Sequence, residues 1–406
     1  MTDGTADNEF AFDVMDQSKT KDWEFLARLR AAHAVSRPSD HMVFTARYEE
    51  TAKAFRDAKT FSSVGDMRAP GVTVSIDESF LGELDAPLHP RIRRLLLRGF
   101  TPAAAERAEG WTRDNVRRRL KAIKDAGGGD LMADFAIPLP GSIAAHELGI
   151  PDELHDEVMK WCNELLHSTW PTHGKTERGE GIAGAFPELA AIIDEQIAMR
   201  RTPTADGPAD LLALMVQTVE DDGWRISEQH VRTLAVNIMA GSLSASYMLG
   251  NLLYRYVDES TGFARVLQDD QSLIPAAVDE SLRHEAPVMF LFRTARTDTE
   301  LGGCPIKAGD HLMLGIGSAN RDPAVYANPE EFRLDRSGEP EHLSFGAGPH
   351  LCLGNHLTRM VGRVTLEEML ATFPPGTLAF APGYEWECVN HLMEYGPETL
   401  DVVVGS

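Results

Sequence analysis

The segment from Thr233 to Tyr254 contains 22 consecutive residues without a charge, between Arg232 and Arg255. A run of this length could span a bilayer as a helix. It also contains five polar side chains that would each need a hydrogen-bond partner in lipid: Asn237, Ser242, Ser244, Ser246 and Asn251. Because lipid offers no such partners, we expect a helix that is buried inside a large folded protein.

Ser227 is a suitable N-cap for this helix, since its hydroxyl can accept a hydrogen bond from an amide of the first turn. A continuous helix from Ser227 to about Val257 would be about 45 Å long. Its centre, residues 240–246, reads AGSLSAS. Small and hydroxyl side chains therefore gather in the middle of an otherwise apolar helix.

The net charge of the chain limits its partners. The 406 residues include 39 Lys and Arg against 62 Asp and Glu, which gives a formal charge of -23. This charge opposes binding to nucleic acid or to an anionic membrane. The four cysteines lie far apart and form no CxxC pair, which favours a reducing compartment. Since the amino-terminal sequence MTDGTADNEF is neither a signal peptide nor a membrane anchor, we expect a cytoplasmic protein.

Helical periodicity dominates the chain, and the strand pattern is minor. Beyond the long helix, we expect helices over residues 22–32, 48–57, 103–126, 131–146, 153–167, 187–200, 274–284 and 354–373. Strands are expected at residues 41–46 and within 290–314. The segments 62–84 and 168–185 have loop compositions, and the second is a candidate lid.

No point along the chain offers a convincing domain boundary. We therefore expect one domain of residues 1–406, mainly α with a minor β component. The β-rich subregion is expected to combine residues from about 38–62 with residues 286–316.

The segment 345–354 reads FGAGPHLCLG and places Cys352 between glycines, directly before a helical pattern. Cys352 could be a buried structural cysteine, a nucleophile with His350 or His356, or a metal ligand. A helix N-terminus favours thiolate over thiol, and glycines let a bulky flat group approach the backbone. Zinc would need about four ligands, and no second cluster of Cys and His completes such a set. These features favour a metal ligand.

This segment resembles the haem-binding loop of the cytochrome P450 family, F-G-x-G-x-H-x-C-x-G. Agreement at six specified positions would occur by chance at roughly 10⁻⁸ to 10⁻⁹ per start site. The resemblance implies that Cys352 is the thiolate ligand of the iron of haem b. It also implies that His350 binds a haem propionate and that Phe345, Gly346 and Gly354 surround the haem. The expected cytochrome P450 fold is a triangular helical prism with haem between the long central helix and the helix after Cys352.

Four further segments resemble the family in the right order. Glu280 and Arg283 match its E-x-x-R motif, a buried pair that acts as a structural lock. Residues 332–336 follow this pair and resemble the family's meander. His89 and Arg93, four residues apart, match its H-x-x-x-R helix, and Arg293 matches its R-x-A strand. By the resemblance, these side chains bind the haem propionates, since buried carboxylates need cationic partners.

The centre of the long helix matches the family's oxygen-binding segment, A-G-x-[D/E]-T-[T/S]. Ala240 and Gly241 would leave room for dioxygen beside the iron. Leu243 stands where the family usually has an acid, and Ser244 stands where it has Thr. Ser244 keeps a hydroxyl that can donate a hydrogen bond and hold a water, whereas Leu243 cannot carry a proton. We therefore expect an atypical proton relay.

Three hypotheses account for the missing acid. Protons could come through water held by Ser244, by Ser242 or by a polar substrate group, which we favour. Peroxide could be the oxidant, since it brings its own protons. The enzyme could instead run an oxidative coupling or desaturation whose substrate supplies what the pocket lacks.

The resemblance implies a monooxygenase that hydroxylates or O-dealkylates a small to medium apolar molecule. Electrons would come from NAD(P)H through a reductase and a ferredoxin. A ferredoxin is acidic, so we expect a basic patch on this acidic chain at Arg91, Arg94, Arg98, Arg359 and Arg363. The alternatives are a peroxide-driven or coupling enzyme and, from another class, a haem sensor or ligand carrier.

The substrate pocket is expected to draw on residues 64–84, 168–185, the long helix, 288–292 and 390–393. We expect an apolar wall at Met289, Phe290 and Phe292, and a polar contact at Asn390 or His391. Side chains of this kind would look the same if they only packed the core.

Overall fold

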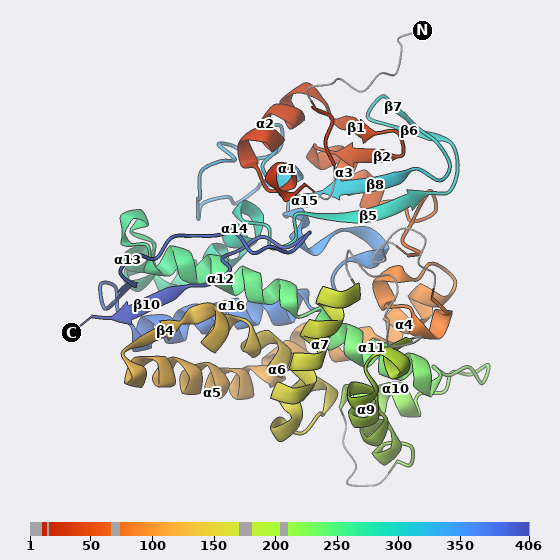
Figure 1. Cartoon of the computed structure of the whole chain (residues 1–406), viewed down its shortest axis with the longest axis horizontal. Helices are drawn as coiled ribbons and strands as arrows, with labels where there is room; N and C mark the ends of the chain where they lie inside the picture. The colour runs from red at the N-terminus through yellow and green to blue at the C-terminus, as the bar shows by residue number, and fades with distance from the viewer. Residues whose placement is uncertain (1–9, 14–15, 66–73, 170–180, 204–209, 406) are drawn as a thin grey trace.

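The computed structural model describes residues 10–13, 16–65, 74–169, 181–203 and 210–405. Figure 1 shows a sheet-containing region that holds β1, β2, β5 and β8 and lies beside a larger array of helices. The order of the elements is mainly α with a minor β component, as predicted. In the described part of the chain, no helix is both long enough and apolar enough to cross a membrane.

Most of the predicted helices form within a few residues of their expected bounds, and the structure adds shorter ones. They are α1 (Gln17–Thr20), α2 (Trp23–Ala32), α3 (Tyr48–Arg56), α4 (Leu88–Leu96), α5 (Pro102–Ala126), α6 (Pro138–Leu148), α7 (His155–Thr169), α8 (Gly181–Ala185), α9 (Pro187–Met199), α10 (Leu211–Gln217), α11 (Glu228–Ala240), α12 (Leu243–Val257), α13 (Phe263–Asp269), α14 (Ile274–His284), α15 (Ile316–Ala319) and α16 (Asn355–Thr372). Residues 170–180 of the candidate lid and 66–73 of the first loop lie outside the described residues.

Local sequence explains where several helices begin and end. The side chains of Asp22, Thr101 and Ser227 each accept a hydrogen bond from a main-chain amide in the first turn of α2, α5 and α11. Gly127 and Gly149 end α5 and α6 in the left-handed conformation, each with φ of 78°. The predicted N-cap at Ser227 is therefore confirmed.

The strands form one larger sheet and two small ones. They are β1 (Val35–Ser39), β2 (Met42–Thr45), β3 (Phe61–Ser62), β4 (Gly128–Asp130), β5 (Phe290–Ala295), β6 (Thr299–Leu301), β7 (Cys304–Ile306), β8 (His311–Gly315), β9 (Leu378–Phe380) and β10 (Asp401–Val404). The larger sheet has the order β1-β2-β8-β5-β3, with β2 and β8 parallel. It thus joins strands from both ends of the sequence, because β2 lies before most of the helices and β8 after them.

The prediction of a single long helix from Ser227 to Val257 was wrong. The structure has two helices, α11 and α12, which are separated at Gly241 and Ser242. At the break the amide of Ser242 donates to the Met239 carbonyl at 3.1 Å, and the amide of Ala245 donates to the Ser242 carbonyl at 3.0 Å. These shorter-range bonds replace the α-helical pattern. Gly and Ser pairs are a common cause of such breaks, since serine hydroxyls compete for main-chain carbonyls.

A second prediction, one helix over residues 131–146, was also wrong. The structure has a π-helical turn, Met132–Ala136, followed by α6. Pro138 stands at the first turn of α6, where its missing amide is tolerated, whereas the interior of a longer helix would lose a hydrogen bond there.

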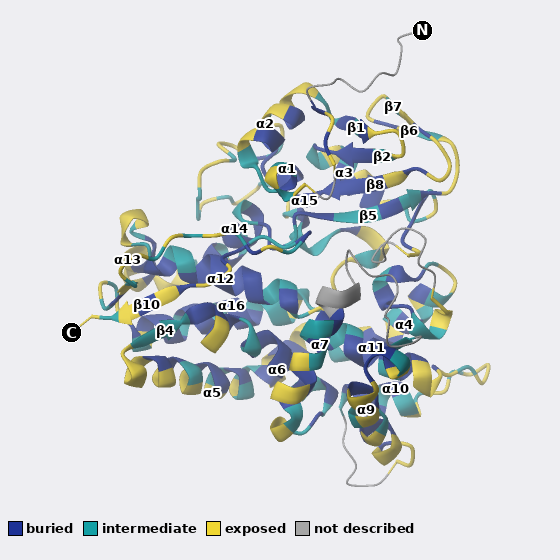
Figure 2. Cartoon of the chain, viewed as in Figure 1, coloured by how far each residue is buried: buried dark blue, intermediate teal, exposed yellow. Residues whose placement is uncertain are grey.

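The two halves of the broken helix pack into different parts of the core. Ala240 on α11 belongs to a cluster formed mainly with α6, α7, α9 and α10, whereas Leu243 on α12 belongs to a cluster with α5, α14 and α16. Figure 2 shows α11, α12 and α16 as largely buried. The break at Gly241 and Ser242 therefore lies between two apolar clusters in the interior of the molecule.

Candidate active site

The loop that carries Cys352 is closed by its own main chain. The Cys352 amide donates to the Phe345 carbonyl at 2.9 Å, and the Leu351 amide donates to the Gly348 carbonyl at 3.1 Å. The Asn355 side chain, in the first turn of α16, donates to the Cys352 carbonyl at 2.8 Å. The thiol is thus held at the entry to α16, as the helical pattern after the loop predicted.

Two glycines of the loop are required by its geometry. Gly346 has φ of 67° with ψ of -162°, a conformation that other residues rarely adopt. Gly348 has φ of 71°, and a Cβ added there would lie 2.9 Å from the Phe55 carbonyl oxygen and 2.8 Å from the Arg56 Cα. These glycines therefore let the loop turn and pack closely against the end of α3.

Cys352 lines a cavity of about 310 Å³ that lies between its loop and the break in the central helices. Gly241, Ser244, Ala245 and Met248 line the opposite wall. Their spacing of three and four residues places them on one helical face. The cavity therefore has the Cys352 sulfur on one side and, apart from Met248, small side chains on the other.

The protein raises the pKa of the Cys352 thiol through burial, because protein surrounds the sulfur although it faces the cavity. The Gly354 amide and the charges of Arg93 and Arg359 oppose this effect. The lowered pKa expected from the helix N-terminus is thus wrong for the protein alone. A metal ion that coordinates a thiol deprotonates it outright.

The expected oxygen-site residues separate into two groups. Gly241 and Ser244 line the cavity, whereas Ala240 and Leu243 are absent from its described lining and pack in the core. Leu243 is only 8% exposed. Its side chain therefore lies away from the space beside Cys352, on a different face of α12 from Ser244.

Both serine hydroxyls at the break are bonded to the main chain. Ser242 Oγ donates to the Met239 carbonyl at 2.6 Å, and Ser244 Oγ donates to the Gly241 carbonyl at 3.2 Å. Each oxygen retains lone pairs that can accept a further hydrogen bond. The hydroxyls stabilise the break and still present acceptors to the cavity.

Cationic and imidazole groups gather at one side of the cavity. His89 and Arg93 lie on α4, and both line the cavity with His350. The rings of His89 and His350 stack with centroids 3.9 Å apart. Burial and then the charge of Arg93 lower the pKa of His89 to about 4, while burial, His89 and Arg293 lower the pKa of His350 to about 3. The histidines are therefore neutral near pH 7, and Arg93 supplies positive charge to the cavity. Arg293, the other arginine expected to bind a propionate, is buried and absent from the described lining, so its role stays a prediction.

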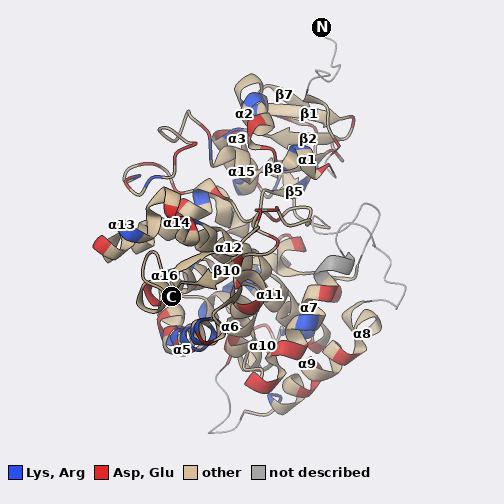
Figure 3. Ribbon diagram, turned by 60° about the vertical axis from the view of Figure 1, so that its left-hand side comes forward, with Lys and Arg blue, Asp and Glu red and all other residues tan. Residues whose placement is uncertain are grey.

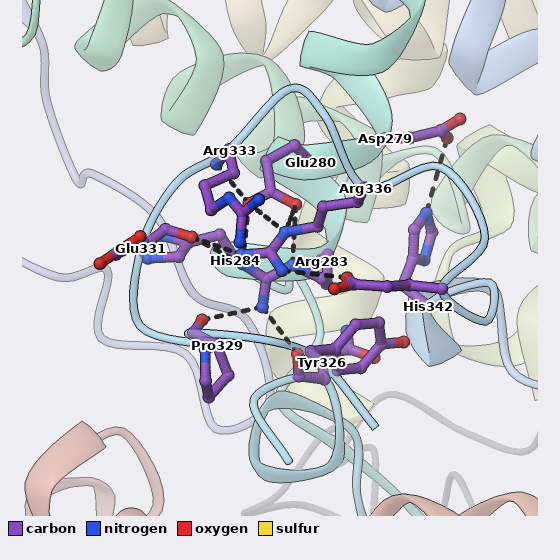
Figure 4. Close-up of polar contacts among 12 residues, drawn as sticks. Asp279, Glu280, Arg283, His284, Tyr326, Pro329, Glu331, Arg333, Arg336 and His342 are labelled. Atoms are coloured by element: carbon purple, nitrogen blue, oxygen red, sulfur yellow. Dashed lines mark hydrogen bonds and ion pairs between the residues drawn. The ribbon is translucent and has the colours of Figure 1, made fainter. Parts of the chain in front are cut away.

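The predicted lock between Glu280 and Arg283 forms in the structure, and Figure 4 shows its surroundings. Arg283 Nε lies 2.7 Å from Glu280, and both side chains are 3% exposed. Arg336, from the meander, contacts the same carboxylate at 2.9 Å, and the amide of Arg333 donates to it at 2.8 Å. Arg336 was not singled out from the sequence, although the spacing to the E-x-x-R motif pointed to its segment.

Arg283 also joins the lock to the loop before the cysteine. Its Nη1 atom donates to the carbonyls of Asn320 at 2.8 Å and Pro329 at 2.9 Å. The Asn320 side chain in turn accepts from the Leu343 amide at 2.7 Å. The ion pairs therefore fix the chain that leads into Phe345 and the cavity.

The five residues expected to bind substrate are absent from the described lining of this cavity. Met289 and Phe290 are buried against the amino-terminal helices, and Phe292 packs beside them. Asn390 Oδ1 accepts from Gln17 Nε2 at 3.0 Å, and His391 Nδ1 lies 3.1 Å from the Tyr247 hydroxyl. Their role in substrate binding stays a prediction.

Other residues supply the cavity wall near this strand and in the first loop. Val288, within the expected range, lines the cavity together with Pro287, and Leu81 comes from the first loop. Ala245 and Met248 were not selected from the sequence. Continuing the helical face from Gly241 by four and seven positions would have found them.

The expected basic patch is largely paired with carboxylates. Arg91 and Arg94 contact Glu220, Arg359 contacts Asp279 at 2.7 Å, and Arg363 contacts Glu367 at 2.9 Å. The net charge of the patch is therefore lower than the count of arginines suggests. An interaction with an acidic partner would compete with these internal pairs.

Comparison with known proteins identifies the family. A model described as Cytochrome P450 matches residues 165–377. Cytochrome P450 130 of Mycobacterium tuberculosis is 34% identical over 352 residues, covering 83% of each chain. Erythromycin C-12 hydroxylase of Saccharopolyspora erythraea is 32% identical over 363 residues, covering 89% of this chain and 88% of that protein.

Solved structures agree with this fold. A mutant of P450 EryK in complex with erythromycin B superimposes with a TM-score of 0.83 at 29% identity, covering 97% of this chain and 98% of that chain. The fold and the cysteine loop are those of the haem-thiolate class of proteins. This chain belongs to the cytochrome P450 family, whose members bind haem b and include monooxygenases.

The described residues fit haem b. Cys352 offers the sulfur ligand, and Leu353, Leu357 and Val361 provide apolar walls. On the cationic side, Arg93 and His89 are placed to bind the propionate carboxylates of haem. When bound, haem with a thiolate ligand supplies oxygen activation, because the thiolate pushes electron density toward iron and favours O–O cleavage.

Proposed function

We propose that this protein is a monooxygenase that inserts one oxygen atom of O2 into a small to medium apolar organic molecule, by hydroxylation or O-dealkylation. One observation carries the proposal, namely the single cavity wall of Gly241, Ser244 and Ala245 opposite Cys352. Small side chains there leave space for dioxygen and for a carbon centre of the substrate. The roles of the predicted haem and oxygen-site residues are part of this proposal.

The apolar character of the cavity supports the proposed substrate class. Leu81, Phe100, Ile143 and Ile238 contribute hydrocarbon surface, and Asn237 is one of the polar side chains of the lining. Apolar pockets with a few polar groups orient a ligand through those groups. Relatives include an enzyme named Erythromycin C-12 hydroxylase and one named Steroid C26-monooxygenase.

The hydroxyls at the helix break support the proposed proton route. Ser244 Oγ and Ser242 Oγ donate to main-chain carbonyls and can each accept from a water in the cavity. Such a water could pass protons without an acid at position 243. Leu243 is buried in the core, so an acid there would not reach the cavity directly.

Electrons are proposed to come from NAD(P)H through a ferredoxin reductase and a ferredoxin, in the cytoplasm. Arg98 and the paired arginines Arg91, Arg94, Arg359 and Arg363 would form the contact with the acidic ferredoxin. We also propose that residues 1–406 act as one domain.

An absorption spectrum tests the haem ligand. The reduced protein with CO should show a band near 450 nm, and Cys352→Ala should abolish it. His356→Ala is the matched control, because His356 is exposed and lies outside the described cavity lining. Absence of the band, or its survival in Cys352→Ala, would refute thiolate ligation.

Turnover in two regimes tests the oxidant. With ferredoxin, reductase and NADH, we expect product that exceeds the product formed with hydrogen peroxide alone. Equal or faster product formation from peroxide would favour a peroxide-driven or coupling enzyme. This is the main alternative to the proposed function, because position 243 holds a buried leucine in place of an acid. Substrate binding without turnover in either regime would favour a carrier or sensor.

A further inference from the structure

A second cavity, of about 600 Å³, lies between the second half of α5, α6 and the start of α7. Helix α6 separates the two cavities, because Ile143 and Ala144 line the cavity beside Cys352 and Ser142 lines the second one. The elements that surround it lie together in Figure 1. Nothing in the proposed reaction uses this space.

Two arginines of α5 are held side by side at the second cavity. Arg118 Nη2 donates to Asn115 Oδ1 at 2.9 Å, and Arg119 Nε donates to the same oxygen at 3.0 Å. Asn115 is 3% exposed and also lines the cavity. A buried amide oxygen therefore fixes two like charges next to each other, an arrangement that an anion would stabilise.

The neighbouring arginines of the same helix behave differently. Arg113 contacts Glu368 at 2.7 Å, and Arg117 contacts the same carboxylate at 2.8 Å. Figure 3 shows the concentration of basic residues along α5. Among the residues that the structure describes, neither Arg118 nor Arg119 forms an ion pair, so their charges are available to a ligand.

The indole ring of Trp111 lines the same cavity as the two arginines. The Trp111 ring stacks on His146 with centroids 4.2 Å apart and planes 14° from parallel, and it meets His155 edge to face at 6.0 Å. Trp111 and His155 both line the cavity. The stacked partners restrict the indole ring, so a planar ligand would meet a preorganised surface.

Carboxylates complete the lining and lie close to the arginines. Asp152, Asp156 and Asp134 line the same cavity. Burial and the charge of Arg118 lower the pKa of Arg119, and Asp156 and Asp134 oppose this effect. Positive and negative groups therefore adjoin each other, as do the carboxylate and ammonium groups of an α-amino acid.

We propose that this second cavity binds a free aromatic α-amino acid. Its carboxylate contacts Arg118 and Arg119, its ring lies against Trp111, and its ammonium group contacts Asp156 or Asp152.

Calorimetric titration of the haem-loaded protein with L-tryptophan tests the site. We expect saturable binding without a shift of the haem absorption band. Indole-3-propionate lacks the ammonium group and tryptamine lacks the carboxylate, so each should bind about tenfold more weakly because one charge-assisted contact is lost. Equal binding of indole-3-propionate, tighter binding of a nucleotide or no saturable binding would overturn the proposal.

Matched variants locate the site. Arg118→Gln should raise the dissociation constant of L-tryptophan about tenfold, and Trp111→Leu should also weaken binding. Arg117→Gln is the control, because it removes a guanidinium from the same helix but outside the cavity lining. Binding that is unchanged in Arg118→Gln, or that shifts the haem band, would place the ligand elsewhere and refute the proposal. Circular dichroism of each variant separates loss of binding from loss of folding.

Discussion

The imidazole rings of His89 and His350 stack face to face, with centroids 3.9 Å apart and planes 27° from parallel. The pKa of His89 is about 4 and that of His350 is about 3, because burial and neighbouring positive groups disfavour their protonation. The pair can therefore donate N–H groups to a carboxylate without adding charge. Arg93, which lines the same cavity, supplies charge instead.

The lowered pKa of His89 predicts a dependence of stability on pH. An unfolded chain protonates this histidine near pH 6.5, whereas the folded protein resists protonation until about pH 4. Since the unfolded state binds more protons in this window, stability falls as the pH decreases from about 6.5 to 4. For His89 alone, the loss at pH 5 should be about 2 kcal/mol.

Urea unfolding of the haem-free protein at pH 7.5 and pH 5 measures this loss. His89→Gln should lose about 2 kcal/mol less than the unmodified protein between these values. The comparison removes contributions from titrating groups that do not interact with His89. Identical losses would contradict the assignment.

Removal of the carboxylate at the lock should destabilise the fold. Glu280→Gln leaves Arg283 and Arg336 buried without their shared counter-charge. The free energy of unfolding should fall by about 3–5 kcal/mol, measured by urea denaturation. Asp335→Asn is the control, since it breaks an exposed pair with Arg333 and should cost less than about 1 kcal/mol.

Placing an acid at position 243 should not repair the proton relay. Leu243 is buried in the core, so Leu243→Asp would bury a carboxyl group and lower stability by about 2–4 kcal/mol. We expect no gain in product formed per NADH oxidised. Leu243→Asn is the control, because asparagine has nearly the same shape as aspartate but no titratable proton. A gain in coupling with Asp but not with Asn would show that the missing acid limits turnover.

The hydroxyl of Ser244 should matter more than that of its neighbour Ser246. Ser244→Ala should lower the product per NADH about tenfold and release peroxide, because a proton-passing water loses its partner. Ser244→Thr should retain coupling. Ser246→Ala removes a hydroxyl that donates to the Ile137 carbonyl, away from the cavity lining, and should leave coupling unchanged. Equal uncoupling in both alanine variants would contradict a specific role for Ser244.

The sequence by itself determined the elements whose signals are local. The N-cap at Ser227 and the glycine-rich turn before Cys352 each depend on residues within a few positions of one another. The family also followed from short motifs and their order. Local hydrogen bonding and backbone conformation are enough to define such features.

Only the tertiary structure decided which of these residues meet. Ser244 faces the cavity and Leu243 faces the core because the packing of α12 against α5, α14 and α16 decides which of its faces is turned to each. Arg336 reaches Glu280, and Arg91 pairs with Glu220, across long stretches of chain. Such contacts depend on how distant helices pack, which no local period in the sequence encodes.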